Sequence, residues 1–246
     1  MKSKSLLGLA IALFFFAACK KNDPVTEPPA KPPVEKPVSD PLELLKDSAS
    51  FTIDGQKIIL TTIATRGISN GKANKKLDSV VKNVEYISED KNLFMFGRFF
   101  KLSSENRNAI TVTFLKKYNK NEIERNLNTT LMVPNNKLDL LSTGEREFAL
   151  DFSRDNAQDG VAIELEGNYN GLQTFGYSSL VYHPALKPEL QKGSKFEVIS
   201  LQKLKSGKYL LEAKFNAAVY YGDGSNIKKF ENGYIRLKLN TEFLYF

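Results

Sequence analysis

Hydrophobic and polar residues alternate with a period of two over most of the chain after residue 50. The clearest run covers residues 211–221, where apolar odd positions alternate with Glu212, Lys214 and Asn216. Successive side chains of a β-strand point to opposite faces, so this pattern predicts a strand with one buried face. Further apolar or alternating runs cover residues 51–53, 56–65, 93–101, 110–114, 148–152, 161–165, 196–204 and 235–239. Together these runs predict about nine to eleven strands.

Turn sequences separate the runs and favour antiparallel pairing. Asp54-Gly55 and Ser206-Gly207 are typical of tight turns, and residues 222–225 predict a longer one. Asp159-Gly160 predicts a hairpin turn between the strands at 148–152 and 161–165, and Gly97 predicts a bulge. Strands with one apolar and one polar face are typical of antiparallel sheets.

These features predict the fold class. The strands do not alternate with long amphipathic helices, which argues against a βαβ architecture. Short helical segments are expected only at residues 42–46, 121–127 and 188–192. We therefore predict an all-β fold, an antiparallel β-sandwich with one or two short helices. A lipocalin-like or other β-barrel is the alternative.

The first 18 residues have the pattern of a secretory signal peptide. Lys2 and Lys4 precede an uncharged stretch at residues 6–18. As a helix, this stretch would span about 20 Å, less than the roughly 30 Å of a hydrocarbon core. The segment therefore predicts a cleaved signal and not a membrane-spanning helix.

The end of this segment, Phe16-Ala17-Ala18-Cys19, resembles the lipobox of bacterial lipoproteins. The resemblance implies cleavage before Cys19, which would become the first residue of the mature chain and carry acyl groups on its sulfur and its amino group. Such a modification would anchor the protein to a membrane. The alternative is an ordinary secretory signal cut near Ala18, with Cys19 unmodified.

A proline-rich segment follows Cys19. Residues 20–41 contain seven of the ten prolines, equal numbers of acidic and basic residues, and no aromatic residue. This composition cannot form a core and favours extended polyproline II, which would reach roughly 70 Å over this length. We therefore divide the chain into a lipoprotein signal peptide (1–18), a lipidated Cys19 with its linker (19–41) and a single β-rich domain (42–246).

Charge and residue usage exclude several classes of function. The net charge is +7, and its basic residues occur as scattered pairs, at 75–76, 116–117 and 228–229. Nucleic-acid binding needs a concentrated basic stripe, so no nucleic-acid partner is expected. A single Cys excludes an intrachain disulfide. With one His and one Cys, most metal sites and most catalytic sites that use His or Cys are excluded as well. We expect no cofactor.

Two groups of acidic residues are candidate sites. Asp155, Asp159, Gly160 and Glu166 fit positions 1, 5, 6 and 12 of a calcium loop, although Ala157 at position 3 offers no side-chain ligand. The favoured interpretation of this segment is a hairpin connection. Glycoside hydrolysis could use a carboxylate pair drawn from Glu164, Glu166 and Asp151. The alternative is that these residues are ordinary acidic residues on the exposed faces of strands.

Both ends of the domain resemble a known group of proteins. Residues 51–55 have the form Phe-x-x-Asp-Gly, and Lys20-Lys21-Asn22-Asp23 follows Cys19. The strand at 209–221 is followed by a Gly-Asp-Gly loop and then by residues 232–235, Asn-Gly-Tyr-Ile. These features resemble uncharacterised β-rich lipoprotein domains of Bacteroidota. The resemblance implies an outer-membrane lipoprotein without an assigned activity or catalytic residues.

We therefore expect a lipid-anchored protein of the outer membrane with a non-enzymatic binding or structural domain. Its partners would be the membrane, through Cys19, and an envelope protein or a glycan. The alternative is a β-barrel that carries a hydrophobic ligand, suggested by 17 Phe residues, four of them in residues 94–100. A continuous apolar cavity on the order of several hundred Å³ would favour the carrier, and a filled core the binding domain. A glycan hydrolase is the least favoured function.

Overall fold

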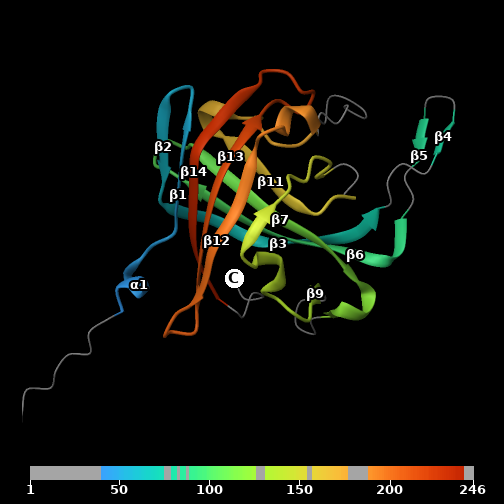
Figure 1. Ribbon diagram of the computed structural model, residues 1–246, viewed down its shortest axis with the longest axis horizontal. Coiled ribbons are helices and arrows are strands. Elements are labelled where there is room, and N and C mark those ends of the chain that lie inside the picture. Colours follow the sequence, from blue (N-terminus) through green and yellow to red (C-terminus); the bar gives the residue numbers. More distant parts are fainter. Residues whose placement is uncertain are drawn as a thin grey trace, which may run out of the picture. The chain divides into compact units, whose positions relative to one another are not determined.

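The computed structural model describes residues 40–74, 79–81, 84–86, 89–125, 131–153, 157–176 and 188–240. The chain divides into two units, Met1–Val38 and Ser39–Phe246, and all described residues belong to the second. Figure 1 shows its elements, which are α1 (Pro41–Leu44), β1 (Ser48–Ile53), β2 (Gln56–Leu60), β3 (Thr62–Asn74), β4 (Ser79–Val81), β5 (Val84–Tyr86), β6 (Glu89–Ser103), β7 (Ala109–Asn119), η1 (Lys120–Glu122), β8 (Ile123–Arg125), β9 (Met132–Pro134), η2 (Asp139–Leu141), β10 (Gly144–Arg146), β11 (Gly160–Glu166), η3 (Gly167–Tyr169), η4 (Pro188–Gln191), β12 (Lys195–Lys203), β13 (Tyr209–Val219) and β14 (Lys228–Leu239).

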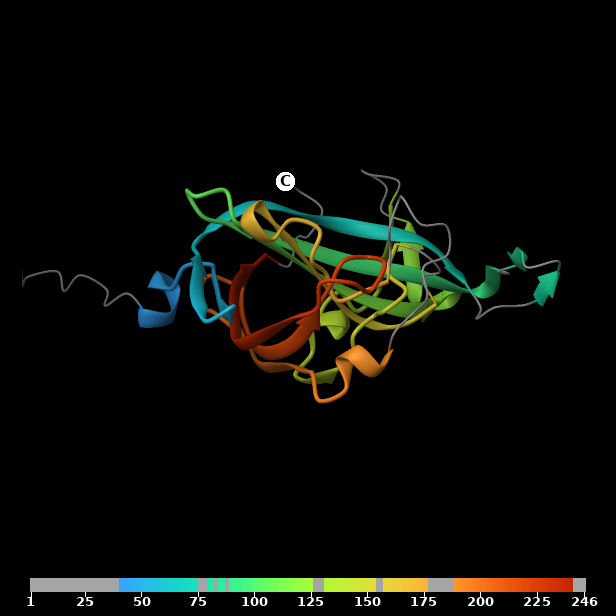
Figure 2. The same ribbon diagram turned by 90° about the horizontal axis from the view of Figure 1, so that it is seen from above.

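Two antiparallel sheets form the body of the domain. The six-stranded sheet has the order β10-β12-β13-β14-β1-β2, and the four-stranded sheet the order β11-β7-β6-β3. Two short pairs, β4-β5 and β8-β9, complete the strands. The sheets form two layers (Figure 2) and do not close into a barrel. The predicted all-β sandwich is confirmed, and the barrel alternative is not the architecture observed.

The chain passes from one sheet to the other at Thr61. We predicted one strand over residues 56–65, but β2 ends at Leu60 in the six-stranded sheet and β3 begins at Thr62 in the four-stranded sheet. Leu60 is buried and Ile63 packs against the same core. In an uninterrupted strand these two residues would face opposite sides, so the corner allows both to reach the interior.

Aromatic rings fill the space between the sheets. Phe196 of β12 stacks on Phe215 of β13 with ring centroids 5.7 Å apart, and meets Phe114 of β7 edge-on at 5.6 Å across the sandwich. Phe114 also contacts Phe100 of β6, and Phe215 contacts Phe230 of β14. Edge-on and offset arrangements are the favourable geometries for aromatic pairs. The two sheets are therefore joined by a continuous set of ring contacts.

Arg98 is a polar residue on the inner face of β6. It is buried, and its guanidinium lies 5.0 Å from the ring centroid of Phe100. Burial, with a smaller contribution from the nearby Arg66, lowers the pKa of Arg98 to about 9. Attraction between the cation and the ring face offsets part of the cost of removing the charge from water.

Several local predictions are confirmed. In β13 the residues at positions 211, 213, 215, 217 and 219 are buried, as the alternation predicts, although Tyr221 lies beyond the strand and is exposed. Asp54 and Gly55 both have positive φ, at 52° and 73°, in the turn between β1 and β2. This backbone geometry fits the two-residue turn expected from the sequence. Gly207, with φ of 84°, turns the chain between β12 and β13.

Other local predictions were wrong. Residues 148–152 form turns and one isolated bridge, a parallel one between Phe148 and Val161, so Asp159-Gly160 is not a hairpin turn. Instead β11 pairs with β7. Gly97 causes no bulge, since its pairing with Leu115 is regular. A Cβ at Gly97 would lie 2.8 Å from Leu115 Cδ2, so the glycine makes room for that side chain.

Helices are short in the described ranges. The α-helix α1 begins one residue before the predicted domain boundary at residue 42, and Asp40 caps it by accepting a hydrogen bond from the Leu42 amide at 3.0 Å. The predicted segment 188–192 contains the 3₁₀ turn η4. The predicted segment 121–127 is not a helix in its described part, which holds the end of η1 and the strand β8, and residues 126–127 lie outside the described residues. Among the described residues, no helix is long and apolar enough to cross a membrane.

Phe196→Ala should destabilise the sandwich by about 3–5 kcal/mol, because it leaves a cavity and removes ring contacts to both sheets. Urea unfolding followed by circular dichroism would measure the change. Ile59→Ala is the control, because Ile59 is 55% exposed and the substitution should cost under about 0.5 kcal/mol. Equal effects of the two substitutions would contradict this account of the core.

Candidate functional site

The predicted calcium ligands do not form one site. Asp159 precedes β11 and Glu166 ends it, so the two are roughly 20 Å apart along an extended strand. Asp159 Oδ1 accepts a hydrogen bond from the Lys117 amide, and Glu166 forms an ion pair with Lys101 at 2.7 Å. Asp155 lies outside the described residues, as does Cys19. Within the described ranges, no group of three or more His, Cys, Asp or Glu residues could hold a metal ion.

The candidate hydrolytic acids are also dispersed. Glu164 and Glu166 share the outer face of β11, but Glu166 is neutralised by Lys101. Asp151 is buried and accepts a hydrogen bond from the Ala157 amide at 2.7 Å. Each carboxylate therefore has a different environment, and they do not converge on one cleft.

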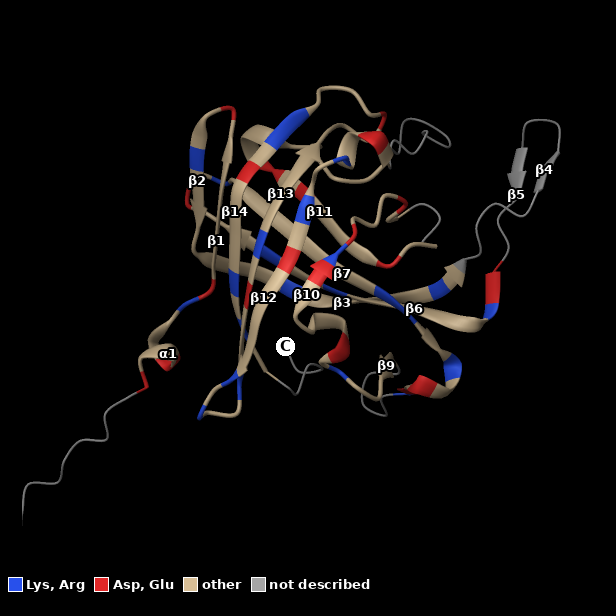
Figure 3. Ribbon diagram, viewed as in Figure 1, with Lys and Arg blue, Asp and Glu red and all other residues tan. Residues whose placement is uncertain are grey.

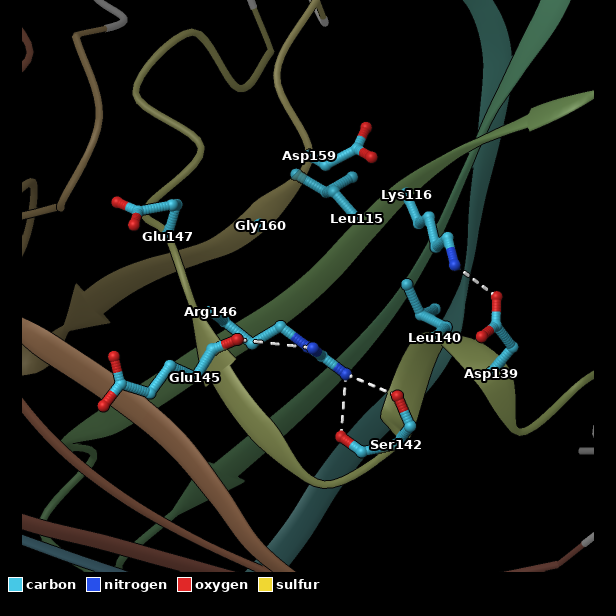
Figure 4. Close-up of a pocket in the computed structure, with 10 residues that line it drawn as sticks. All are labelled: Leu115, Lys116, Asp139, Leu140, Ser142, Glu145, Arg146, Glu147, Asp159 and Gly160. Carbon is cyan, nitrogen blue, oxygen red and sulfur yellow. Dashed lines mark hydrogen bonds and ion pairs between the residues drawn. The ribbon is translucent and has the colours of Figure 1, made fainter.

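A charged pocket lies between η2, β10 and the start of β11, with a volume of about 240 Å³ (Figure 4). Leu115 and Leu140 contribute its apolar part. Lys116 pairs with Asp139 at 2.5 Å, and Arg146 donates hydrogen bonds to the carbonyl and hydroxyl oxygens of the same residue, Ser142, at 2.7 and 2.8 Å. Both cations are thus occupied by groups of the protein itself.

A second pocket, of about 370 Å³, lies on the outer face of the four-stranded sheet. Its size is within the range of small-molecule sites. We call it the outer-face pocket. It is lined by Ile68, Ser69, Phe99, Thr111, Thr113, Phe152, Ser153, Ala162, Glu164 and Phe175.

Strand register places the parts of the outer-face pocket. Phe99 of β6 is paired with Thr113 of β7, which is paired with Ala162 of β11, and in the next row Thr111 is paired with Glu164. These side chains share one face because paired residues in adjacent strands point the same way. The residues at the alternate positions of the same strands, such as Val112 and Phe114, point to the other face and fill the core.

One wall of the outer-face pocket is the Phe99 ring. A Cβ at Gly67 would come within 2.5 Å of Phe99 Cζ, so the tip of the ring lies directly over this glycine. Phe99 is only partly buried. The absence of a side chain at Gly67 therefore allows the ring to lie across β3 while part of its surface stays accessible.

The opposite wall comes from segments that fold back over the sheet. Phe152 and Phe175 meet edge-on with centroids 5.1 Å apart, and Phe175 packs against Ala162. Backbone hydrogen bonds hold both segments, from Thr174 to the Ile163 carbonyl and from Gly176 to the Leu150 carbonyl. The strand β6, which carries Phe99, and the strand β11, against which Phe175 packs, are separated by β7, so the backbones of these two strands are roughly 10 Å apart.

Glu164 is the acidic group of the outer-face pocket. Burial is the main cause that raises the pKa of its carboxyl above the ordinary value of 4.5; Glu166 adds to the effect and Lys101 opposes it. Among the described residues its carboxylate accepts no hydrogen bond. The pocket thus combines aromatic walls, a floor that includes Thr111 and the buried Thr113, and one carboxylate, a composition typical of ligand sites.

Sequence reasoning identified Glu164 as a surface acid or a member of a hydrolytic carboxylate pair, and Phe99 as one of the clustered Phe residues that suggested a carrier. The signal that could have marked the site is the outward row of Thr111 and Thr113 opposite a buried row. The contribution of Phe152 and Phe175 comes from segments outside regular strands, which alternation does not predict. Comparison with protein-family models, with curated proteins and with solved structures found no match to this chain.

Glu164→Gln should change how stability depends on pH. Since the pKa of Glu164 is higher in the folded than in the unfolded state, this carboxyl disfavours folding increasingly as the pH rises above about 4.5. The amide carries no such penalty, so the variant should gain stability relative to wild type between pH 4 and 7. We expect this gain to grow as the pH rises from 4 towards 7.

Urea unfolding of both proteins at pH 4 and pH 7 would test this expectation. Glu166→Gln is the control, because it removes the partner of Lys101 and should give no gain at neutral pH. The raised pKa of Glu164 would be contradicted if the difference in unfolding free energy between Glu164→Gln and wild type did not change with pH.

Proposed function

We propose that this chain is a non-catalytic, lipid-anchored envelope protein that binds a saccharide in the outer-face pocket. The observation that carries the proposal is the placement of Phe99 opposite Phe152 and Phe175 on either side of a hydroxyl-bearing floor. It supports the binding function expected from the sequence and favours a glycan over an envelope protein as the partner.

The chemistry of a sugar ring matches this arrangement. A pyranose presents C–H groups on its faces and hydroxyl groups around its edge. Aromatic rings pack well against such apolar faces, and their π-systems attract the positive ends of C–H bonds. The partly exposed Thr111 can donate or accept hydrogen bonds, and Glu164 can accept them from sugar hydroxyls.

Binding without hydrolysis is the more consistent activity. Glycoside hydrolysis commonly uses two carboxyl groups that flank the scissile bond. In the described lining of the outer-face pocket, Glu164 supplies one carboxyl group. The carrier alternative is disfavoured because Phe100, Phe114 and Phe196 occupy the interior between the sheets.

The anchoring part of the proposal depends on the sequence. Residues 16–19 resemble a lipobox, and the proline-rich residues 20–41 would connect the lipid to the sandwich. The resemblance to Bacteroidota lipoproteins supports the outer membrane as the location. In this arrangement the chain presents its saccharide site from a membrane surface.

Phe99→Ala should weaken saccharide binding at least about ten-fold, because it removes one aromatic wall of the pocket. The ligand would first be identified by applying residues 39–246 to a glycan array, and affinities would then be measured by calorimetry. Glu164→Gln should also weaken binding, since an amide is a poorer acceptor than a carboxylate.

Two further variants make the test specific. Gly67→Ala keeps every aromatic residue but forces the Phe99 ring to move, so it should also reduce affinity. Tyr221→Ala removes an exposed aromatic side chain outside the pocket and should leave affinity unchanged. Absence of glycan binding, or equal losses in Phe99→Ala and Tyr221→Ala, would refute the proposed site.

Cys19→Ala should release the protein from the membrane fraction of the cells that make it, because the acylated residue is lost. Fractionation followed by immunoblotting would measure this, and mass spectrometry of the native protein would detect acyl groups on Cys19. Unchanged membrane retention of Cys19→Ala would count against lipidation.

A further inference from the structure

The end of the sandwich where the linker enters has a distinctive surface. We call it the tether end and define it by α1 with residues 45–47, the β12–β13 turn at residues 203–208, and the end of β14 at residues 236–238. Basic residues colour the tip of the β12–β13 hairpin in Figure 3, and hydrogen bonds from Ser206 to Glu43 join this turn to α1.

Hydrogen bonds fix the tether end as one surface. The Ser206 amide and hydroxyl donate to the two carboxylate oxygens of Glu43 at 2.8 and 3.1 Å. Lys238 Nζ donates to the Glu43 carbonyl at 2.6 Å, and the Lys238 amide donates to Asp47 Oδ1 at 2.6 Å. Arg236 Nε donates to the Lys46 carbonyl at 3.1 Å. The first residues of the domain are therefore held against β14 and the hairpin turn.

The acidic groups of the tether end are used in these internal contacts. The pKa of Glu43 is lowered, chiefly by the hydrogen bond from the Ser206 amide. Asp40 caps α1 and lies 4.0 Å from Lys205 Nζ, and Asp47 bonds to β14. The carboxylates are thus committed to holding the chain.

The lysines of the same end point to solvent. Lys203, Lys205 and Lys208 in the hairpin turn are exposed, as is Lys46 after α1. Beside them, Leu44 is 68% exposed, the most exposed of the large apolar residues described. The surface therefore presents exposed positive charges around one apolar side chain, a combination that favours the headgroup region of an anionic bilayer.

We propose that the tether end rests on the membrane surface, with its lysines on anionic lipid headgroups and Leu44 inserted at their level. The inference relies on the proposed anchoring for its context, since the chain leading to Cys19 leaves the domain at this end. A linker of about 22 residues is long enough to let the sandwich lie either away from the membrane or against its surface. Attraction between the lysines and anionic headgroups favours the position against the surface. The outer-face pocket is then held at a fixed distance from the membrane.

Vesicle binding by residues 39–246, which form a compact unit without the lipid-bearing segment, tests the proposal. The fragment should co-sediment with phosphatidylglycerol-containing vesicles at low salt, and much less with pure phosphatidylcholine or at high salt. Each lysine at an anionic surface contributes about five-fold to partitioning. Lys203→Glu, Lys205→Glu and Lys208→Glu together should therefore reduce binding by more than about ten-fold. Leu44→Asp should also reduce it.

The matched control reverses three lysines at the opposite end of the strands, Lys57→Glu, Lys192→Glu and Lys229→Glu. These residues are exposed and lie near the β1–β2 turn or near the start of β14. The control has the same net charge as the tether-end variant and should retain most of the binding. Equal losses in both variants, or no preference for anionic vesicles, would overturn the proposal. Because the fragment lacks Cys19, either result is independent of whether the native protein is acylated.

Discussion

The contact of aromatic rings between the two sheets is the constraint on which the rest of the domain depends. Phe196 meets Phe114 across the sandwich, and Phe114 determines which face of β7 is buried. Side chains in a strand alternate, so burying Val112 and Phe114 obliges Thr111 and Thr113 to face outward. A slip of one residue would exchange the two rows and would place hydroxyl groups in the core. The chemistry of the outer-face pocket is therefore a direct consequence of core packing on the reverse side of the same strands.

The all-β class, the sandwich and the main strands could be predicted from the sequence because they depend on short-range patterns. The buried row of β13 follows from strict alternation, and the β1–β2 turn follows from Asp54-Gly55, whose positive φ values few other residue pairs tolerate. The helix α1, at Pro41–Leu44, overlaps the short helical segment expected at residues 42–46. In each case the physical cause lies within a few residues of its effect.

The features that could not be predicted depend on contacts between distant segments. The corner at Thr61 interrupts a run that resembles one strand in the sequence, and it depends on the position of the second sheet. Residues 148–152 alternate as a strand would, but Phe148 meets Val161 in a parallel bridge and the rest turns away. The same applies to the candidate site. The role of Gly67 depends on the Phe99 ring that lies over it. Glu164 differs from Glu166 because it is more buried and because Glu166 pairs with Lys101.

The pairing of β1 with β14 has a consequence for how the molecule is made. Asp47 and Lys238, 191 positions apart, are hydrogen-bonded, and β1 lies between β2 and the last strand of the described chain. During synthesis, which begins at the N-terminus, the β1–β2 hairpin has one edge of β1 unpaired until β14 has been made. Pairings of such high sequence separation form slowly, and an open edge attracts other chains in the meantime. The larger sheet is therefore complete only after β14 has inserted between β1 and β13.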